Sequence, residues 1–263
     1  MSSEGFDGGI FDVDGVLVDS PHERAWKESL RDLMEHDWAD VRDGSEWSDD
    51  RFTPQVYQRV ISGKPRMAGA RAGLDYFKVP DVDDRVATYA EHKQKVLVRL
   101  IDAGDFTAYP DALRFVLAVR RSGIPIAAAS SSKNADLFLR RIRLDTFAEQ
   151  EGLTDDFIRP GMNLLDVFDA DLSGRDLAHG KPDPEIFLTA AAELGVPAEQ
   201  CFVVEDAASG VQAAKAGKMA ALGIARADDQ ELLADAHADL VVTSLDEVDV
   251  AGLARHRLAR VSA

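Results

Sequence analysis

A strand predicted over residues 8–13 ends in two aspartates, Asp12 and Asp14, that are separated by one residue. A carboxylate can attack phosphorus and form an aspartyl phosphate, and a second carboxylate can donate or remove the proton of the reacting oxygen. Asp12 as nucleophile and Asp14 as general acid and base would divide the chemistry in this way. Taken alone, an Asp-x-Asp pair is more typical of a solvated loop or a helix cap, so the prediction depends on the groups that join it.

Other polar groups stand beside predicted strands in the same manner. Glu205 and Asp206 follow the strand 201–204, Lys181 precedes the next predicted helix, and a polar run follows the strand 124–129: Ser130, Ser131, Ser132, Lys133 and Asn134. Carboxylate oxygens suit Mg²⁺, and the candidate ligands are Asp12, Asp14, Glu205 and Asp206. No cluster of histidines or cysteines suits zinc. Ser130 or Ser132 and Lys181 would hold the phosphoryl oxygens and stabilise the charge of the transition state.

Each of these groups also has a purely structural interpretation. Ser132 could cap a helix, Lys181 could be a surface lysine, and the Glu205-Asp206 pair could cap the helix that begins near residue 209. Their shared position beside strands favours a single site, because ligands of parallel α/β folds bind at the carboxyl edge of the sheet.

The elements that must position these groups alternate between strand and helix. Strands are predicted at 8–13, 124–129, 201–204, 219–224 and 239–243, with helices between the later ones, which indicates a parallel, doubly wound sheet. Helices are expected to begin at four capping residues, Ser20, Asp111, Ser132 and Asp183. Residues 20–107 are mostly helical and interrupt the sheet after its first strand. The prediction is therefore an α/β fold, with a Rossmann-like core formed by 1–19 and 108–263 and a helical cap domain formed by 20–107.

Composition excludes several classes of function. The formal net charge of −17 argues against a nucleic-acid partner, because such binding depends on basic groups. No apolar run is long enough to span a bilayer, and the short polar start lacks the pattern of a secretory signal, so we expect a cytoplasmic protein with no membrane partner. The single cysteine, Cys201, lies in an apolar run and is expected to be a buried structural thiol. The expected assembly is a monomer or a small homo-oligomer.

Four segments together resemble the motifs of the haloacid dehalogenase superfamily. These are 11–20, which holds Asp12 and Asp14, the serine group at Ser130, 180–184 around Lys181, and 204–206. The resemblance covers nearly the whole chain. It implies a Rossmann-like core, an inserted helical cap, Mg²⁺, Asp12 as nucleophile and Asp14 as acid and base. The second aspartate is typical of the phosphotransferase branch and is absent from the dehalogenases.

Within that superfamily the chain is similar to the β-phosphoglucomutases, in the segments 22–26, 62–66, 109–110 and 130–134. A mutase must hold two phosphates, so it needs a second anion site in the cap. The candidate substrate-binding residues there are His22, Gly63, Lys64 and Arg66, because guanidinium and ammonium groups grip phosphate, and Lys133 and Asn134 would help from the core.

The predicted function is thus Mg²⁺-dependent phosphoryl transfer on a small phosphorylated metabolite, a hexose phosphate. The first choice is conversion of β-glucose 1-phosphate to glucose 6-phosphate, and the alternative is a phosphatase acting on a sugar phosphate or another metabolite. A protein that binds a phosphometabolite without turnover is a third hypothesis, which the retained Asp12 and Asp14 oppose. The long segment 151–179 is interpreted either as an elaborated loop beside the active site or as a surface excursion.

Overall fold

Six parallel strands form the main sheet of this computed structural model, which describes residues 5–261. The strand order is β5-β4-β1-β6-β7-β8, and every neighbouring pair is parallel. The predicted parallel α/β core is therefore confirmed. The strands are β1 (Gly8–Phe11), β4 (Ile126–Ala128), β5 (Ala170–Asp171), β6 (Cys201–Glu205), β7 (Ala220–Ile224) and β8 (Leu240–Val242).

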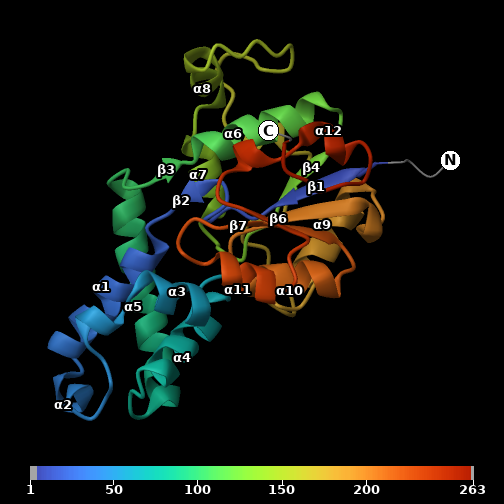
Figure 1. The fold of residues 1–263 in the computed structure, drawn as a ribbon. Helices are drawn as coiled ribbons and strands as arrows, with labels where there is room; N and C mark the ends of the chain where they lie inside the picture. The colour runs from blue at the N-terminus through green and yellow to red at the C-terminus, as the bar shows by residue number, and fades with distance from the viewer. Residues whose placement is uncertain (1–4, 262–263) are drawn as a thin grey trace. The chain divides into compact units, whose positions relative to one another are not determined.

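Helices cover both faces of this sheet, as Figure 1 shows: α6 and α12 lie on one face and α9, α10 and α11 on the other. Their bounds are α6 (Pro110–Arg121), α9 (Glu185–Leu194), α10 (Ala208–Ala216), α11 (Gln230–Asp235) and α12 (Val250–Leu253). The remaining elements of this part of the chain are α7 (Ala135–Arg141), α8 (Leu144–Gln150), η2 (Leu165–Val167), η3 (Ala198–Gln200) and η4 (Leu245–Glu247). This doubly wound arrangement leaves the carboxyl ends of the strands free to carry polar loops.

Strand β1 is central, and all four of its residues are buried. It pairs with β4 on one side and β6 on the other, so that Phe11 stands level with Ala128 and Val204. The loops that follow these three strands therefore leave the sheet at one edge. Apolar side chains pack under that edge, among them Ile10, Phe187 and Val203. This packing holds the strand ends, and therefore the polar residues that follow them, in position.

The chain forms two compact units, one made of the segments up to Asp19 and from Ala108, the other of Ser20–Thr107. The second unit is helical: α1 (His22–Glu35), α2 (Ala39–Arg42), η1 (Asp49–Arg51), α3 (Pro54–Val60), α4 (Arg66–Tyr76) and α5 (Val82–Asp102). It has its own apolar core, in which the Tyr89 ring packs edge-on against Trp26 and its hydroxyl donates to the Trp26 carbonyl at 3.0 Å. Two short strands, β2 (Val18–Asp19) and β3 (Thr107–Ala108), pair where the chain passes between the units.

Several expected helix caps are wrong in detail. Helix α1 has Pro21 at its N-cap position, so Ser20 does not cap it, and Asp111 lies inside the first turn of α6. Helix α7 begins only at Ala135, and the Ser132 hydroxyl instead accepts from the Asn134 amide at 3.3 Å. Proline explains two of these shifts, because a proline fixes the start of a helix without needing an N–H partner.

The segment 151–179 contains regular structure that neither interpretation included. It contains η2 and the edge strand β5, whose residues Ala170 and Asp171 pair with Ala127 and Ala128 of β4. Part of the supposed excursion therefore completes the sheet. A two-residue strand is too short to leave an alternating pattern in the sequence.

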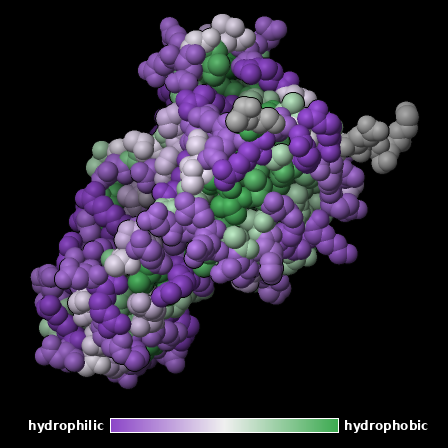
Figure 2. Space-filling model, viewed as in Figure 1, coloured by the Kyte–Doolittle hydropathy of each residue, from purple (hydrophilic) through white to green (hydrophobic). Residues whose placement is uncertain are grey.

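The surface is largely polar, in keeping with the charge. Figure 2 shows hydrophilic residues over most of the visible face. Among the residues that the structure describes, no helix has the length and apolar character needed to cross a membrane. The polar start on which the cytoplasmic expectation partly rests, residues 1–4, lies outside the described residues.

Candidate functional site

A buried lysine lies between two buried carboxylates at the carboxyl edge of the sheet. The Lys181 ammonium donates to Asp12 Oδ1 at 2.6 Å and also to Glu205 Oε1. Asp12 directly follows β1 and Glu205 is the last residue of β6, so the pairing of these two strands sets the distance between the two acids. The three side chains are at most 8 % exposed. These three groups thus meet at one sheet edge, as the sequence predicted, and Lys181 is not a surface lysine.

Burial controls the protonation of this cluster. Desolvation raises the pKa of the Asp12 carboxyl to about 8, with Lys181 opposing the rise and the negative charges of Glu205 and Asp14 adding to it. Burial alone would favour a neutral Lys181, but the carboxylates of Asp12 and Glu205 outweigh it and raise the lysine pKa above its usual value. The site therefore carries an excess of negative charge that one ammonium group does not balance.

The chemistry of the donors fits a hard cation. Asp12, Glu205 and Asp206 each offer a carboxylate oxygen, and these atoms lie within 4.8 Å of one another in a buried group. Oxygen ligands of this kind and excess negative charge are what Mg²⁺ prefers. Both Glu205 oxygens already accept hydrogen bonds, from Lys181 and from the Ala207 amide. Asp12 and Asp206 are consequently the better candidates for direct ligands, and Glu205 anchors the lysine.

Two glycines make room for these carboxylates. A Cβ atom on Gly15, whose φ is +79°, would lie 2.0 Å from Asp206 Oδ2. A Cβ atom on Gly210, in the first turn of α10, would lie 1.9 Å from the Glu205 carboxyl carbon. Real Cβ atoms do not come this close to other heavy atoms, so both acids occupy space that only glycine leaves open.

Asp14 is not among the three carboxylates whose oxygens lie within 4.8 Å of one another. Its carboxylate accepts a hydrogen bond from the Ser130 hydroxyl at 3.1 Å. Ser130 is buried and in turn accepts from the Ser132 amide at 3.0 Å. The serine that follows β4 thus contacts the second aspartate, which was expected both as a metal ligand and as an acid and base.

The rest of the polar run after β4 divides into buried and exposed residues. Asn134 is buried, and Ser131 and Ser132 are partly buried. Lys133 is exposed, and its ammonium forms an ion pair with Asp176. In this arrangement Lys133 is held by a surface carboxylate rather than by the buried group around Lys181.

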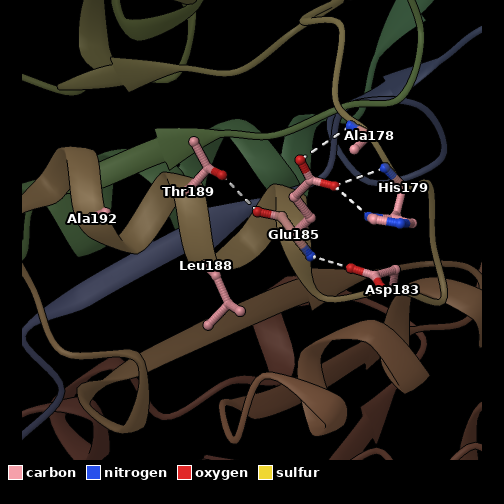
Figure 3. Close-up of a pocket in the computed structure, with 7 residues that line it drawn as sticks. All are labelled: Ala178, His179, Asp183, Glu185, Leu188, Thr189 and Ala192. Carbon is pink, nitrogen blue, oxygen red and sulfur yellow. Dashed lines mark hydrogen bonds and ion pairs between the residues drawn. The ribbon is translucent and has the colours of Figure 1, made fainter.

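The loop that carries Lys181 is anchored by the start of α9. Figure 3 shows the Glu185 carboxylate accepting from the backbone amides of Ala178 and His179, at 3.1 and 2.7 Å, and from the His179 ring. The Asp183 carboxylate accepts from the Glu185 amide at 3.0 Å. A second group that could hold a metal ion consists of His179, Asp183 and Glu185. The hydrogen bonds just described explain why these side chains lie together, because they form the turn that leads from Lys181 into α9.

The residues expected in the cap all lie in the helical unit, where two of them are engaged locally. His22 Nδ1 lies 2.7 Å from the ammonium of Lys93, which is buried and faces the Trp26 ring at 5.0 Å. Lys64 donates to the Val60 carbonyl at 2.7 Å, and burial lowers its pKa. Arg66 is exposed at the start of α4, and Gly63 has a φ of +74° between α3 and α4.

Sequence reasoning missed two basic residues next to predicted ones. Lys93 contacts His22, and its only sequence signal is a charged residue on the apolar face of a long amphipathic helix, α5. Arg226 lies two residues beyond β7, at the same sheet edge as Asp12, and donates to backbone carbonyls of the loop that follows Asp14. The rule used for the other strand ends would have found it.

Comparisons with known proteins find similarity over most of this chain. The family model described as haloacid dehalogenase-like hydrolase matches residues 7–218. A β-phosphoglucomutase of Mycobacterium bovis is 31% identical over 258 residues, which covers 91% of this chain and 90% of that protein. Validoxylamine A 7'-phosphate phosphatase of Streptomyces hygroscopicus subsp. limoneus is 26% identical over 250 residues, covering 91% and 94%. The crystal structure of an archaeal β-phosphoglucomutase from Pyrococcus sp. Strain ST 04 superposes with a TM-score of 0.65 at 28% identity, covering 94% of this chain and 96% of that one.

Proposed function

Because the chain belongs to the haloacid dehalogenase-like hydrolases and is an enzyme of that superfamily, we propose that it transfers the phosphoryl group of a hexose phosphate through Asp12. The observation that carries the proposal is the buried Lys181 ammonium between Asp12 and Glu205, with Asp206 beside them. The similarity to β-phosphoglucomutases favours isomerisation of β-glucose 1-phosphate to glucose 6-phosphate.

In the first half of the reaction, an Asp12 oxygen attacks phosphorus in line. The new bond joins this oxygen to phosphorus, the ester bond of the substrate breaks, and Asp14 gives its proton to the leaving oxygen. Lys181, which donates to Glu205 as well as to Asp12, offsets part of the negative charge of the cluster. Mg²⁺ held by Asp12 and Asp206 would supply positive charge that favours ionised Asp12. The same charge would reduce the repulsion between the Asp12 carboxylate and the phosphoryl oxygens.

In the second half, Asp14 removes a proton from the incoming hydroxyl group. That oxygen attacks the aspartyl phosphate, the Asp12–phosphorus bond breaks, and Asp12 is regenerated. The hydrogen bond from Ser130 holds the Asp14 carboxylate in one orientation through both steps. If the hydroxyl belongs to a sugar phosphate, the net reaction is isomerisation, and if it belongs to water, the net reaction is hydrolysis.

A phosphatase acting on a small phosphorylated metabolite is the second candidate. Two observations favour it: Lys64 donates to a carbonyl of its own unit, and Arg66 is exposed, so the two cations expected for the second phosphate do not form a preassembled pair. The similarity to a validoxylamine phosphate phosphatase points the same way.

The discriminating assay supplies β-glucose 1-phosphate, Mg²⁺ and a trace of β-glucose 1,6-bisphosphate. Glucose 6-phosphate without free phosphate supports the mutase, and inorganic phosphate without glucose 6-phosphate supports the phosphatase. Asp12→Asn should lower the turnover of either reaction by several orders of magnitude. Asp7→Asn is the matched control, because Asp7 precedes the opposite end of the same strand. Equal turnover in the Asp12 variant and the wild type would remove Asp12 as the nucleophile.

A further inference from the structure

One arginine at the site edge binds three separate groups of the core unit. Arg226 Nη1 donates to Asp111 Oδ2 at 2.8 Å, Nε donates to the Gly15 carbonyl at 3.3 Å, and Nη2 donates to the Val16 carbonyl at 3.1 Å. Its guanidinium carbon also lies 3.8 Å from the centroid of the Tyr109 ring. The side chain is only 14 % exposed, so these contacts are shielded from competing water.

The carboxylate that holds Arg226 is itself fixed. Asp111 Oδ2 also accepts from the Leu245 amide at 2.8 Å and from the Ser244 hydroxyl at 3.3 Å. Asp111 therefore ties the arginine to α6 and η4, two elements of the core unit. A planar guanidinium group with five donors can reach one carboxylate and two carbonyls at once, whereas a lysine ammonium acts as a single compact charge.

The two carbonyls belong to the tight turn that begins at Asp14. The Gly15 amide donates to the Val18 carbonyl at 2.8 Å, and the Leu17 and Val18 amides both donate to the Val13 carbonyl. Gly15 is the neighbour of Asp14 in the chain and packs directly against the Asp206 carboxylate. A shift of this turn would therefore move Asp14, the proposed acid and base. It would also change the space that the Asp206 carboxylate occupies.

We propose that Arg226 is a positioning residue of the phosphotransfer site, which clamps the turn at Gly15 and Val16 so that Asp14 and Asp206 keep their places. The inference rests on the proposed function for its kinetic consequence, but the clamp itself is a property of the fold. Arg226 does not touch the reacting atoms in this scheme. Its effect reaches them through the backbone of the turn.

The test compares Arg226→Met with Arg114→Met. Arg114 is the matched control, since its guanidinium also pairs with carboxylates, Asp246 and Glu151, in the same unit but without touching the turn. Arg226→Met should lower kcat by about 10²-fold, because a displacement of ~1 Å in a site can cost that much, and should leave KM within about 2-fold, since the turn positions groups for the chemical step. Arg114→Met should leave both constants unchanged.

Hydrogen–deuterium exchange gives a readout that does not depend on turnover. Amides of residues 15–18 should exchange at least about 10-fold faster in Arg226→Met than in Arg114→Met, because opening of the turn costs less free energy without the clamp. Arg226→Lys should resemble Arg226→Met, since one ammonium cannot serve three acceptors. Wild-type exchange in Arg226→Met, or wild-type behaviour of Arg226→Lys, overturns the clamp.

The two proposals fail in different ways. A wild-type protein that turns over no phosphate ester in the mutase and phosphatase assays contradicts the proposed function, while the exchange experiment still decides whether Arg226 holds the turn. An active wild type whose Arg226→Met variant exchanges faster but keeps its kcat shows a clamp that is structural only, and it refutes the positioning role.

Discussion

Replacing Gly210 with alanine should destabilise the protein, although alanine is the better helix former. Gly210 lies in α10, where the exchange would ordinarily gain about 0.5–1 kcal/mol. The new Cβ atom would lie 1.9 Å from the Glu205 carboxyl carbon. Van der Waals distance is ~3.5 Å, so the carboxylate must move by about 1.5 Å, which is enough to break its hydrogen bonds to Lys181 and the Ala207 amide.

The magnitude follows from what Lys181 loses. Removing one partner of a buried ion pair costs about 3–5 kcal/mol, and the gain in helix propensity offsets a small part of it. Lys181 keeps Asp12, which places the net loss at the lower end, about 2–3 kcal/mol. Activity should fall with it, because Lys181 then no longer stands between its two carboxylates.

Gly73→Ala is the matched control. Gly73 is also a buried helical glycine, in α4, but the nearest atom to its added Cβ is the flexible end of Ile61 at 3.3 Å. Its stability should change by less than about 1 kcal/mol. Urea unfolding should be followed by circular dichroism, because all three tryptophans, at 26, 38 and 47, lie in the helical unit and their fluorescence does not report the core.

A double variant tests the cause. Glu205→Asp shortens the side chain by one methylene, so in combination with Gly210→Ala it removes the clash. The loss of stability in the double variant should therefore be smaller than the sum of the losses in the two single variants. The reasoning is refuted if Gly210→Ala unfolds at the wild-type urea concentration with unchanged turnover. Strict additivity in the double variant would show that Glu205 is not the group that alanine displaces.

Three further predictions concern metal, pH and the thiol. Mg²⁺ should raise the Tm of the metal-free protein, because ligands of the native state stabilise it. The Asp206→Asn variant should lose most of this rise in Tm, and the Asp183→Asn control should keep it. An equal rise in both variants contradicts Asp206 as a metal ligand. Burial opposes ionisation of Asp111, but the Arg226 guanidinium and a backbone amide outweigh it and lower its pKa. The resulting stabilisation is complete above about pH 4 and is lost as the pH falls through the folded-state pKa, so the stability gap to Asp111→Asn, measured by urea unfolding, should close in acid; a gap that widens there has the wrong sign. Burial raises the pKa of the Cys201 thiol to about 12, so a thiol reagent at pH 8 should label it only as fast as the protein opens, and rapid labelling of the native protein would contradict its burial.

The sequence by itself was enough to predict the parallel core and the meeting of Asp12, Lys181 and Glu205 at one edge of its sheet. Asp12 and Glu205 stand at the ends of two paired strands, and in a parallel sheet such residues meet at one edge whatever their distance in the chain, while Lys181 reaches them from the loop before α9. The pattern holds because strand burial produces apolar runs that end abruptly, and these ends are visible in the sequence. The helical character of residues 20–107 was predictable for the same reason, since amphipathic helices repeat their apolar face.

Only the tertiary structure shows which partner each charged or polar group of the site contacts. That Glu205 holds Lys181, that Ser130 holds Asp14 and that Arg226 holds Gly15 are contacts between residues more than 20 positions apart, and no local pattern encodes such pairs. The Asp111 side chain was expected to cap a helix, but it lies inside the first turn of α6, and its carboxylate pairs with Arg226. A single charged side chain carries no periodic signal, so its partner is fixed by the packing of whole elements and becomes visible only when the sheet and its helices are assembled.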